Sequence, residues 1–127
     1  MKKIILLTLL SLTLIASSYT VKDTPQKHIE KNTLTIAELF KNRDKYVGKV
    51  VTVKGKVTKV LNAIMKLNWI HIQDGSNFSN MSDIVFTSTE TAPKVGTVVY
   101  ATGTLIKDKD FGYGYFYPVI IQNSTFK

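Results

Sequence analysis

The chain has 127 residues, which suits a single domain, and it contains no cysteine. Disulfide scaffolds are therefore excluded, and so is covalently attached c-type haem, which needs a Cys-x-x-Cys-His motif. With 17 basic and 9 acidic side chains, the formal net charge is +8. This charge permits anionic partners such as nucleic acid, phospholipid headgroups or acidic glycans, but it does not identify one.

Residues 1–18 have the pattern of a secretory signal peptide: a positive head at 1–3, a mostly apolar run at 4–15, and small residues at 16–18. The apolar run is 12 residues long, shorter than the roughly 20 of a membrane span. We therefore expect cleavage after Ser18 rather than retention as an anchor, which leaves a net charge of +6. No cysteine follows the run, which excludes a diacylated lipoprotein. The sequence predicts a periplasmic or secreted bacterial protein.

Residues 19–33 mix charges with Pro25 and show no sustained periodicity, so we predict a flexible lead-in. Thr35 and Glu38 have the spacing of a capping box at a helix start. Three apolar residues then follow at i, i+3 and i+4, namely Ile36, Leu39 and Phe40. They predict one short amphipathic helix that ends near residues 43–46.

From residue 49 the apolar residues alternate with polar ones, which predicts β-strands with one buried face. Ile70 and Ile72 share one side of the second strand, and Gly55 lies on the inward side of the first, where it suits a bend. The five predicted strands span 49–60, 68–73, 83–87, 97–106 and 116–125. We predict an all-β domain over 34–127, apart from the short helix, closed into a small barrel because closure removes unpaired strand edges.

Several segments together resemble a known family. They are Tyr46-x-Gly48-Lys49-x-Val51-x-Val53-x-Gly55-x-Val57, Ile64-Met65, the block Asn68-Trp69-Ile70-His71-Ile72-Gln73-Asp74-Gly75, Gly103, and Lys109-Asp110-Phe111-Gly112-x-Gly114-Tyr115. The family is that of small exported bacterial OB-fold proteins, some of them encoded beside periplasmic multihaem cytochromes and nitrite reductase systems. The resemblance implies a five-stranded Greek-key barrel, described as nucleotide-binding or nucleic-acid-binding by fold analogy. Members often carry Met-Gly before the asparagine–tryptophan pair, whereas here Lys66 and Leu67 follow Met65.

The usual ligand surface of an OB-fold is the outer side of strands 2 and 3, with the loops joining strands 1–2 and 4–5. If Ile70 and Ile72 fill the barrel, alternation places Trp69, His71 and Gln73 outside, where an indole can stack on a base or a sugar. In the alternative interpretation, the predicted helix or the lead-in covers Trp69, as happens to most large aromatic side chains.

Lysines form a second part of the predicted site. Six lysines and no acidic residue lie between residues 45 and 73. Lys54 and Lys56 are predicted on the outer face of the first strand and Lys66 in the first flanking loop, so an anionic chain could follow them. A solvated strand face explains the same alternation. Arg43 is the only arginine, which argues against bidentate phosphate recognition.

The segment 107–118 is predicted to be the second flanking loop. It presents Phe111, Tyr113 and Tyr115 between glycines, so it could grip a ring or a protein partner. The alternative is a lid whose rings close the barrel.

No catalytic or metal-binding pattern is present, so we predict a non-enzymatic binding module without a cofactor. The ligand is expected to be anionic or ring-bearing, a nucleic acid or glycan by fold analogy. The alternative is an accessory module that docks on a periplasmic redox enzyme or envelope assembly protein.

Overall fold

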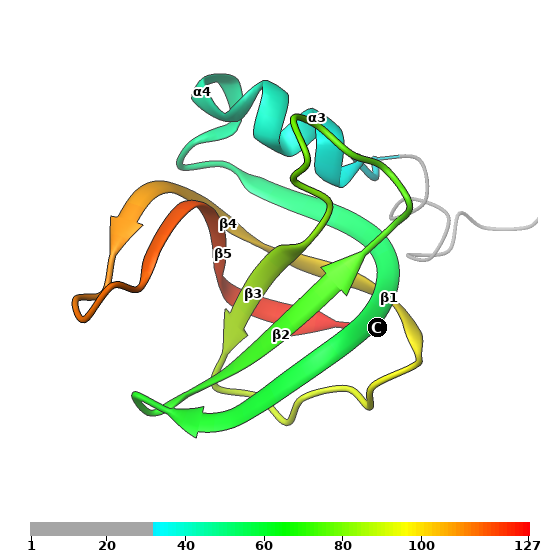
Figure 1. The fold of residues 1–127 in the computed structure, drawn as a ribbon. Helices are drawn as coiled ribbons and strands as arrows, with labels where there is room; N and C mark the ends of the chain where they lie inside the picture. Colours follow the sequence, from blue (N-terminus) through cyan, green and yellow to red (C-terminus); the bar gives the residue numbers. More distant parts are fainter. Residues whose placement is uncertain (1–31) are drawn as a thin grey trace, which may run out of the picture.

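A computed structural model describes residues 32–127; the predicted signal peptide and nearly all of the predicted lead-in lie outside this range. It contains two short helices and five strands (Figure 1). These are α3 (Ile36–Lys41), α4 (Arg43–Tyr46), β1 (Val50–Ile64), β2 (Leu67–Gln73), β3 (Ile84–Ser88), β4 (Val98–Asp110) and β5 (Phe116–Phe126).

The five strands form a closed sheet in the order β1-β2-β3-β5-β4. β1 is long enough to pair with two neighbours: Val50–Lys56 pair with β4, and Lys56–Ile64 with β2. Every pairing is antiparallel except the contact of β3 with β5, where Phe86 is opposite Ile121. The prediction of a mostly β chain with a closed five-stranded sheet is confirmed.

The interior of the sheet is the main hydrophobic core. Alternate residues point inward as the sequence pattern predicts, and Val53, Ile70, Ile72 and Phe86 are fully buried. Gly55 is an inward position where a Cβ atom would lie 2.6 Å from Ile72 Cγ2. Glycine is therefore required there because β1 and β2 approach too closely for any side chain.

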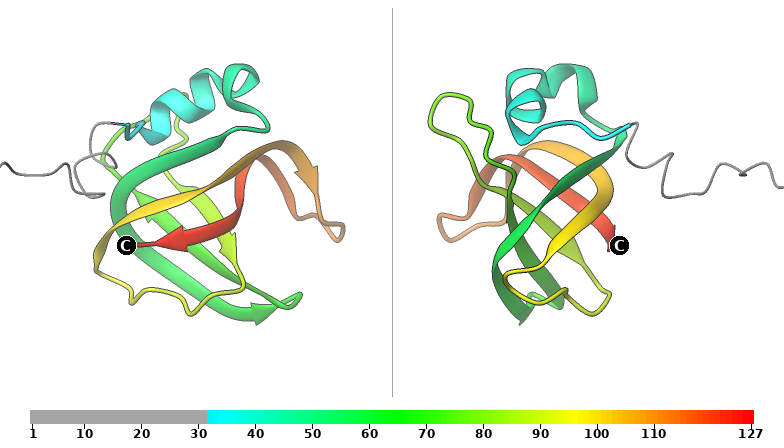
Figure 2. Two further views of the ribbon diagram at one scale, coloured as in Figure 1. Left: turned by 180° about the vertical axis from the view of Figure 1, so that it is seen from behind. Right: turned by 90° about the vertical axis from the view of Figure 1, so that its right-hand side faces the viewer.

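The two helices lie over one end of the closed sheet (Figures 1 and 2). The predicted capping box at Thr35 and Glu38 is present, and the apolar stripe of α3 is buried. The single helix predicted for this segment is wrong, because the chain breaks at Asn42 and continues as α4. The loop after β2 fixes α3 in place: Asp74 Oδ2 accepts from the Ile36 amide at 2.9 Å.

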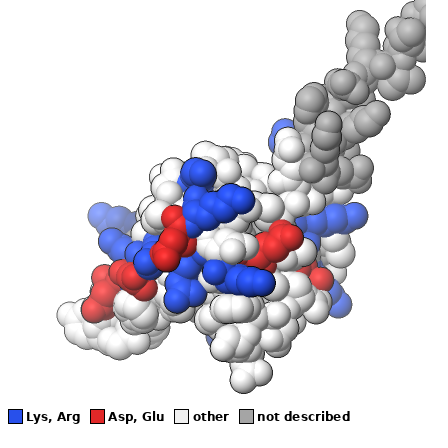
Figure 3. All heavy atoms as spheres, turned by 90° about the horizontal axis from the view of Figure 1, so that it is seen from above, with Lys and Arg blue, Asp and Glu red and all other residues white. Residues whose placement is uncertain are grey.

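Seen from the helical end, basic and acidic side chains are interspersed (Figure 3). Lys107 on β4 binds Asp44 on α4, which lowers the pKa of Asp44 and raises that of Lys107 through their hydrogen bond and charge attraction. This face therefore carries no continuous basic patch. Within residues 32–127, no helix is long and apolar enough to cross a membrane.

Candidate ligand groove

A second apolar cluster lies outside the closed sheet, on the outer face of β2 and β3. Its buried members are Trp69, Val85 and Ile120. Phe111 and Tyr117, from the hairpin formed by β4 and β5, pack over them. This hairpin folds back across the sheet, so the outer face of β2 is partly covered.

The prediction that Trp69 is displayed on the surface is wrong, because the side chain is only 4% exposed. Alternation does place it on the outer face, opposite to Ile70 and Ile72, but Phe111 contacts it edge-on with ring centroids 5.0 Å apart. Tyr117 lies 6.0 Å from it on a tilted plane. The indole Nε1 donates to the Ile64 carbonyl at 2.8 Å. The ring therefore ties the two hairpins together and does not present a free stacking face.

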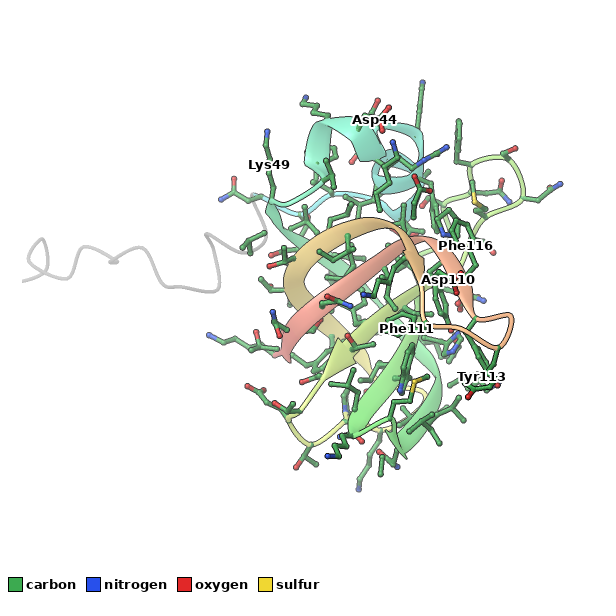
Figure 4. The ribbon with its side chains drawn as sticks, turned by 90° about the vertical axis from the view of Figure 1, so that its left-hand side faces the viewer. Asp44, Lys49, Asp110, Phe111, Tyr113 and Phe116 are labelled. Atoms are coloured by element: carbon green, nitrogen blue, oxygen red, sulfur yellow. The ribbon has the colours of Figure 1, made fainter. Side chains whose placement is uncertain are left out.

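The segment 107–118 is a β-hairpin for most of its length and not the loop that the sequence predicts. Lys107 pairs with Val119, Lys109 with Tyr117, and Asp110 with Phe116. Only residues 111–115 form the turn. Tyr113 is fully exposed at its outer end, whereas Phe111 turns back over the sheet (Figure 4).

A groove of about 160 Å³ is lined by residues of the β1–β2 hairpin and the β4–β5 hairpin. The tips of both hairpins lie at the left in Figure 1. We call this groove the interhairpin groove. Its lining consists of Leu61, Ile64, Met65, Trp69, His71, Tyr115 and Tyr117. Three of the predicted site residues therefore meet here, namely Trp69, His71 and Tyr115.

Exposed apolar side chains are concentrated on the two hairpins that form this groove. They hold six of the ten exposed large hydrophobic side chains in the described part of the chain: Leu61, Ile64, Met65 and Tyr115, which line the groove, and Tyr113 and Phe116, which lie outside it. Exposed apolar side chains that gather around a groove mark an interaction site, whereas isolated ones do not.

The β1–β2 turn holds one side of the groove in a strained conformation. Met65 and Lys66 have φ angles of 53° and 64°, and Ala63 one of 58°. Positive φ at both central residues is typical of a two-residue type I′ turn, which usually contains asparagine and glycine. Here Met65 and Lys66 occupy the two central positions, so the turn adopts this tight conformation without a glycine. Lys66 is exposed at its tip and does not line the groove.

His71 brings a polar group to the groove. Its Nδ1 lies 2.8 Å from Asp83 Oδ2, and the two side chains are 22% and 36% exposed. Tyr117 also lines the groove, and burial, followed by the nearby phenol of Tyr115 and the charge of Asp83, raises the pKa of its phenol above 10.0.

The predicted lysines lie mainly in a second depression, the basic hollow. It encloses about 420 Å³ and is lined by Lys54, Gly55, Lys56, Thr58, Gln73, Asp74, Gly75 and Val98. The strand register joins it to the interhairpin groove: along the outer face of β1 and β2, Lys56 is opposite Gln73, Lys59 opposite His71, and Leu61 opposite Trp69. One continuous face therefore carries both depressions.

Five residues of the site were not among the predicted site residues: Leu61, Ile64, Met65 and Tyr117 line the groove, and Asp83 binds His71 from outside it. Strict alternation would place Leu61 on the inward side with Val53 and Val57, and it faces outward, opposite Trp69, only because the register of β1 shifts between Val57 and Lys59. Asp83 reaches His71 only because β3 pairs with β2. Within residues 32–127, no cluster of three or more potential metal ligands is present.

Neither a scan against protein-family models nor a search of curated proteins finds a match to this chain.

Proposed function

We propose that this chain is an exported, non-enzymatic OB-fold binding module. The strand order, the closure of the sheet by β1, the single parallel contact of β3 with β5 and the helix over one end support the Greek-key OB assignment. The signal-like residues 1–18 support export to the periplasm or secretion.

The interhairpin groove is the observation that carries the proposal. It lies on the outer β2–β3 face between the two hairpins that flank the ligand surface of OB-folds. Its volume of about 160 Å³ is below the roughly 300–1,000 Å³ of a typical small-molecule pocket. A groove of this size suits one anchoring group of a larger ligand.

The lining favours a polypeptide as that ligand. Leu61, Ile64 and Met65 are 41–50% exposed, and methionine and aromatic residues are enriched where proteins meet. The ring face of Trp69 is covered by Phe111 and Tyr117, so it offers no platform for a base. The accessory role of docking on a periplasmic protein is therefore the better supported of the two predicted functions.

A second candidate is an anionic chain such as single-stranded nucleic acid or an acidic glycan. Lys54, Lys56 and Lys59 follow one another along the outer face of β1, which leads into the groove. Phosphates or carboxylates could lie over these lysines while a ring enters the groove.

Site-specific photocrosslinking tests the protein-docking proposal. A benzoylphenylalanine replaces Met65 in one variant and Val95, which is similarly exposed at 59% against 50%, in the matched control. We expect a discrete protease-sensitive adduct from position 65 only, in the cells that produce the chain. Equal adducts from both positions, or none from position 65, would contradict the proposal.

Titration with the oligonucleotide (dT)10 tests the second candidate. Binding through three lysines would weaken steeply between 50 and 200 mM salt. Each neutralised phosphate of a single strand contributes about −0.7 to the slope of the logarithm of the binding constant against the logarithm of the salt concentration. Saturable, salt-sensitive NMR shifts at Lys54, Lys56 and Lys59 would favour nucleic acid over protein.

A further inference from the structure

His71 contributes an imidazole to the lining of the interhairpin groove, and one of its two ring nitrogens already has a partner. Asp83 holds His71 Nδ1 at 2.8 Å but does not itself line the groove, whereas His71 does. Within residues 32–127, no side-chain nitrogen or oxygen is both buried and without a partner. Because the described contacts give Nε2 no partner, this atom is not sealed from solvent.

The carboxylate determines which chemical role Nε2 has. An ionised Asp83 can only accept a hydrogen bond, so Nδ1 must carry the proton. A neutral imidazole protonated at Nδ1 has a lone pair at Nε2. The groove therefore offers a hydrogen-bond acceptor among apolar side chains, and it selects for a ligand group that donates.

The surrounding charge restricts the ligand further. Lys54, Lys56 and Lys59 are exposed on this face, and Lys66 is exposed at the neighbouring turn. The carboxylates of the same face have internal partners: Asp83 binds His71, and Asp74 binds the first turn of α3 and Ser76. The face is thus complementary to acidic segments.

We propose that the interhairpin groove binds a tryptophan or tyrosine side chain, within an acidic segment of a partner protein, whose N–H or O–H donates to His71 Nε2. This inference rests on the proposed protein-docking function and specifies its ligand. The ring fills the groove against Leu61, Met65 and Tyr117, and the acidic flanks lie over the lysines.

Three peptides test the ligand. The first is the acetylated, amidated pentapeptide Asp-Glu-Trp-Glu-Asp; the second carries 1-methyltryptophan, which keeps the ring but lacks the donor; the third has lysines as flanks. Binding is followed by NMR shifts of residues 63–66 and 115–117 at pH 8. We expect the first peptide to bind about fivefold more tightly than the second at pH 8, equivalent to one hydrogen bond. The lysine peptide should bind most weakly.

Variants isolate the role of His71. His71→Phe removes the acceptor and should abolish the preference for tryptophan over 1-methyltryptophan. Asp83→Asn, which no longer fixes the tautomer, should reduce it. Tyr113→Phe, at an exposed position outside the groove, is the control and should leave it unchanged. The fluorescence emission of Trp69, whose side chain is buried in the folded protein, reports whether each variant is folded.

The outcomes separate this inference from the proposed function. Equal binding of the tryptophan and 1-methyltryptophan peptides at the groove would overturn only the role of His71. Tighter binding of the lysine peptide would overturn the acidic partner. Absence of all peptide shifts at residues 63–66 and 115–117, with shifts from (dT)10, would overturn both the inference and protein docking.

Discussion

Gly55 shows how one residue sets the shape of the closed sheet. A Cβ atom at this position would lie 2.6 Å from Ile72 Cγ2 and 2.7 Å from the Gln73 carbonyl oxygen. We expect Gly55→Ala to lower the free energy of unfolding by about 1–3 kcal/mol, because β1 and β2 must separate to admit the methyl group.

Urea denaturation measures this change, with Lys56→Ala as the control. Lys56 is the next residue of the same strand and is exposed, so its substitution should change stability by less than about 0.5 kcal/mol. Equal stabilities of the two variants would contradict the close approach of the strands.

Tyr117 in the groove lining makes the stability of the protein depend on pH. Burial is the first cause that raises the pKa of its phenol above 10.0, so the folded protein resists ionisation more than the unfolded chain. The resulting stability is complete below pH 10 and is lost as pH rises through the raised pKa of the folded state. We therefore expect the free energy of unfolding to fall above about pH 10, and to fall less steeply in Tyr117→Phe. Urea titrations from pH 8 to pH 11 measure the free energy of unfolding of both proteins. An equal decrease in the native chain and in Tyr117→Phe would show that Tyr117 is not responsible.

At the scale of elements, the β4–β5 hairpin both covers Trp69 and forms one side of the groove. Phe111 contacts Trp69 edge-on, and Tyr113 two residues later is fully exposed. We expect Phe111→Ala to destabilise the protein by about 1–3 kcal/mol, less than the loss of a fully buried ring. Trp69, the only tryptophan, should then shift its emission to the red and become quenchable by acrylamide. Tyr113→Ala is the matched control and should change neither property.

The β1–β2 turn is the second element that borders the groove. Met65 and Lys66 both adopt positive φ, which asparagine and glycine tolerate better. We expect the double substitution Met65→Asn and Lys66→Gly to raise the thermal midpoint, with a gain of about 0.5–1 kcal/mol from relieved backbone strain. It should also weaken groove binding because it removes the methionine. A less stable double variant would show that the native turn is unstrained.

At the scale of the whole molecule, the two apolar clusters predict a gradient of local stability. The closed sheet buries Val53, Ile72 and Leu105 completely, whereas the turns at 63–66 and 112–115 are mostly exposed. In native-state hydrogen exchange, we expect the amides of the sheet to exchange slowest, at the free energy of global unfolding. The two turns should exchange much faster. Equal protection of the amides in the two turns and in the sheet would contradict this gradient of local stability.

Much of the fold was predictable because alternation is a local property of the chain. The pattern identified the inward set of β1 and the pair Ile70 and Ile72, and the capping box at Thr35 is a contact within one helical turn. Strand ends were less predictable. The predicted first and fourth strands stopped at residues 60 and 106, whereas β1 and β4 end at Ile64 and Asp110, since their last residues form hairpins outside the core and lack a buried stripe.

The candidate site was only half predictable for a related reason. Sequence reasoning brought Trp69, His71 and Tyr115 to the same face, but it could not show that Phe111 covers the indole or that Asp83 orients the imidazole. Those contacts join residues on different strands, and their geometry depends on how the β4–β5 hairpin bends over the sheet.

Local patterns in the sequence were enough to identify five strands, the inward faces of the first two and the helix start at Thr35, because these depend on neighbouring residues and on simple periodicity. Packing between distant segments controls which outward residues remain accessible. A side chain on the outer face of a sheet is exposed only where no distant segment packs on it, and here the folded-back hairpin buried Trp69 while leaving His71 at the edge of an apolar groove.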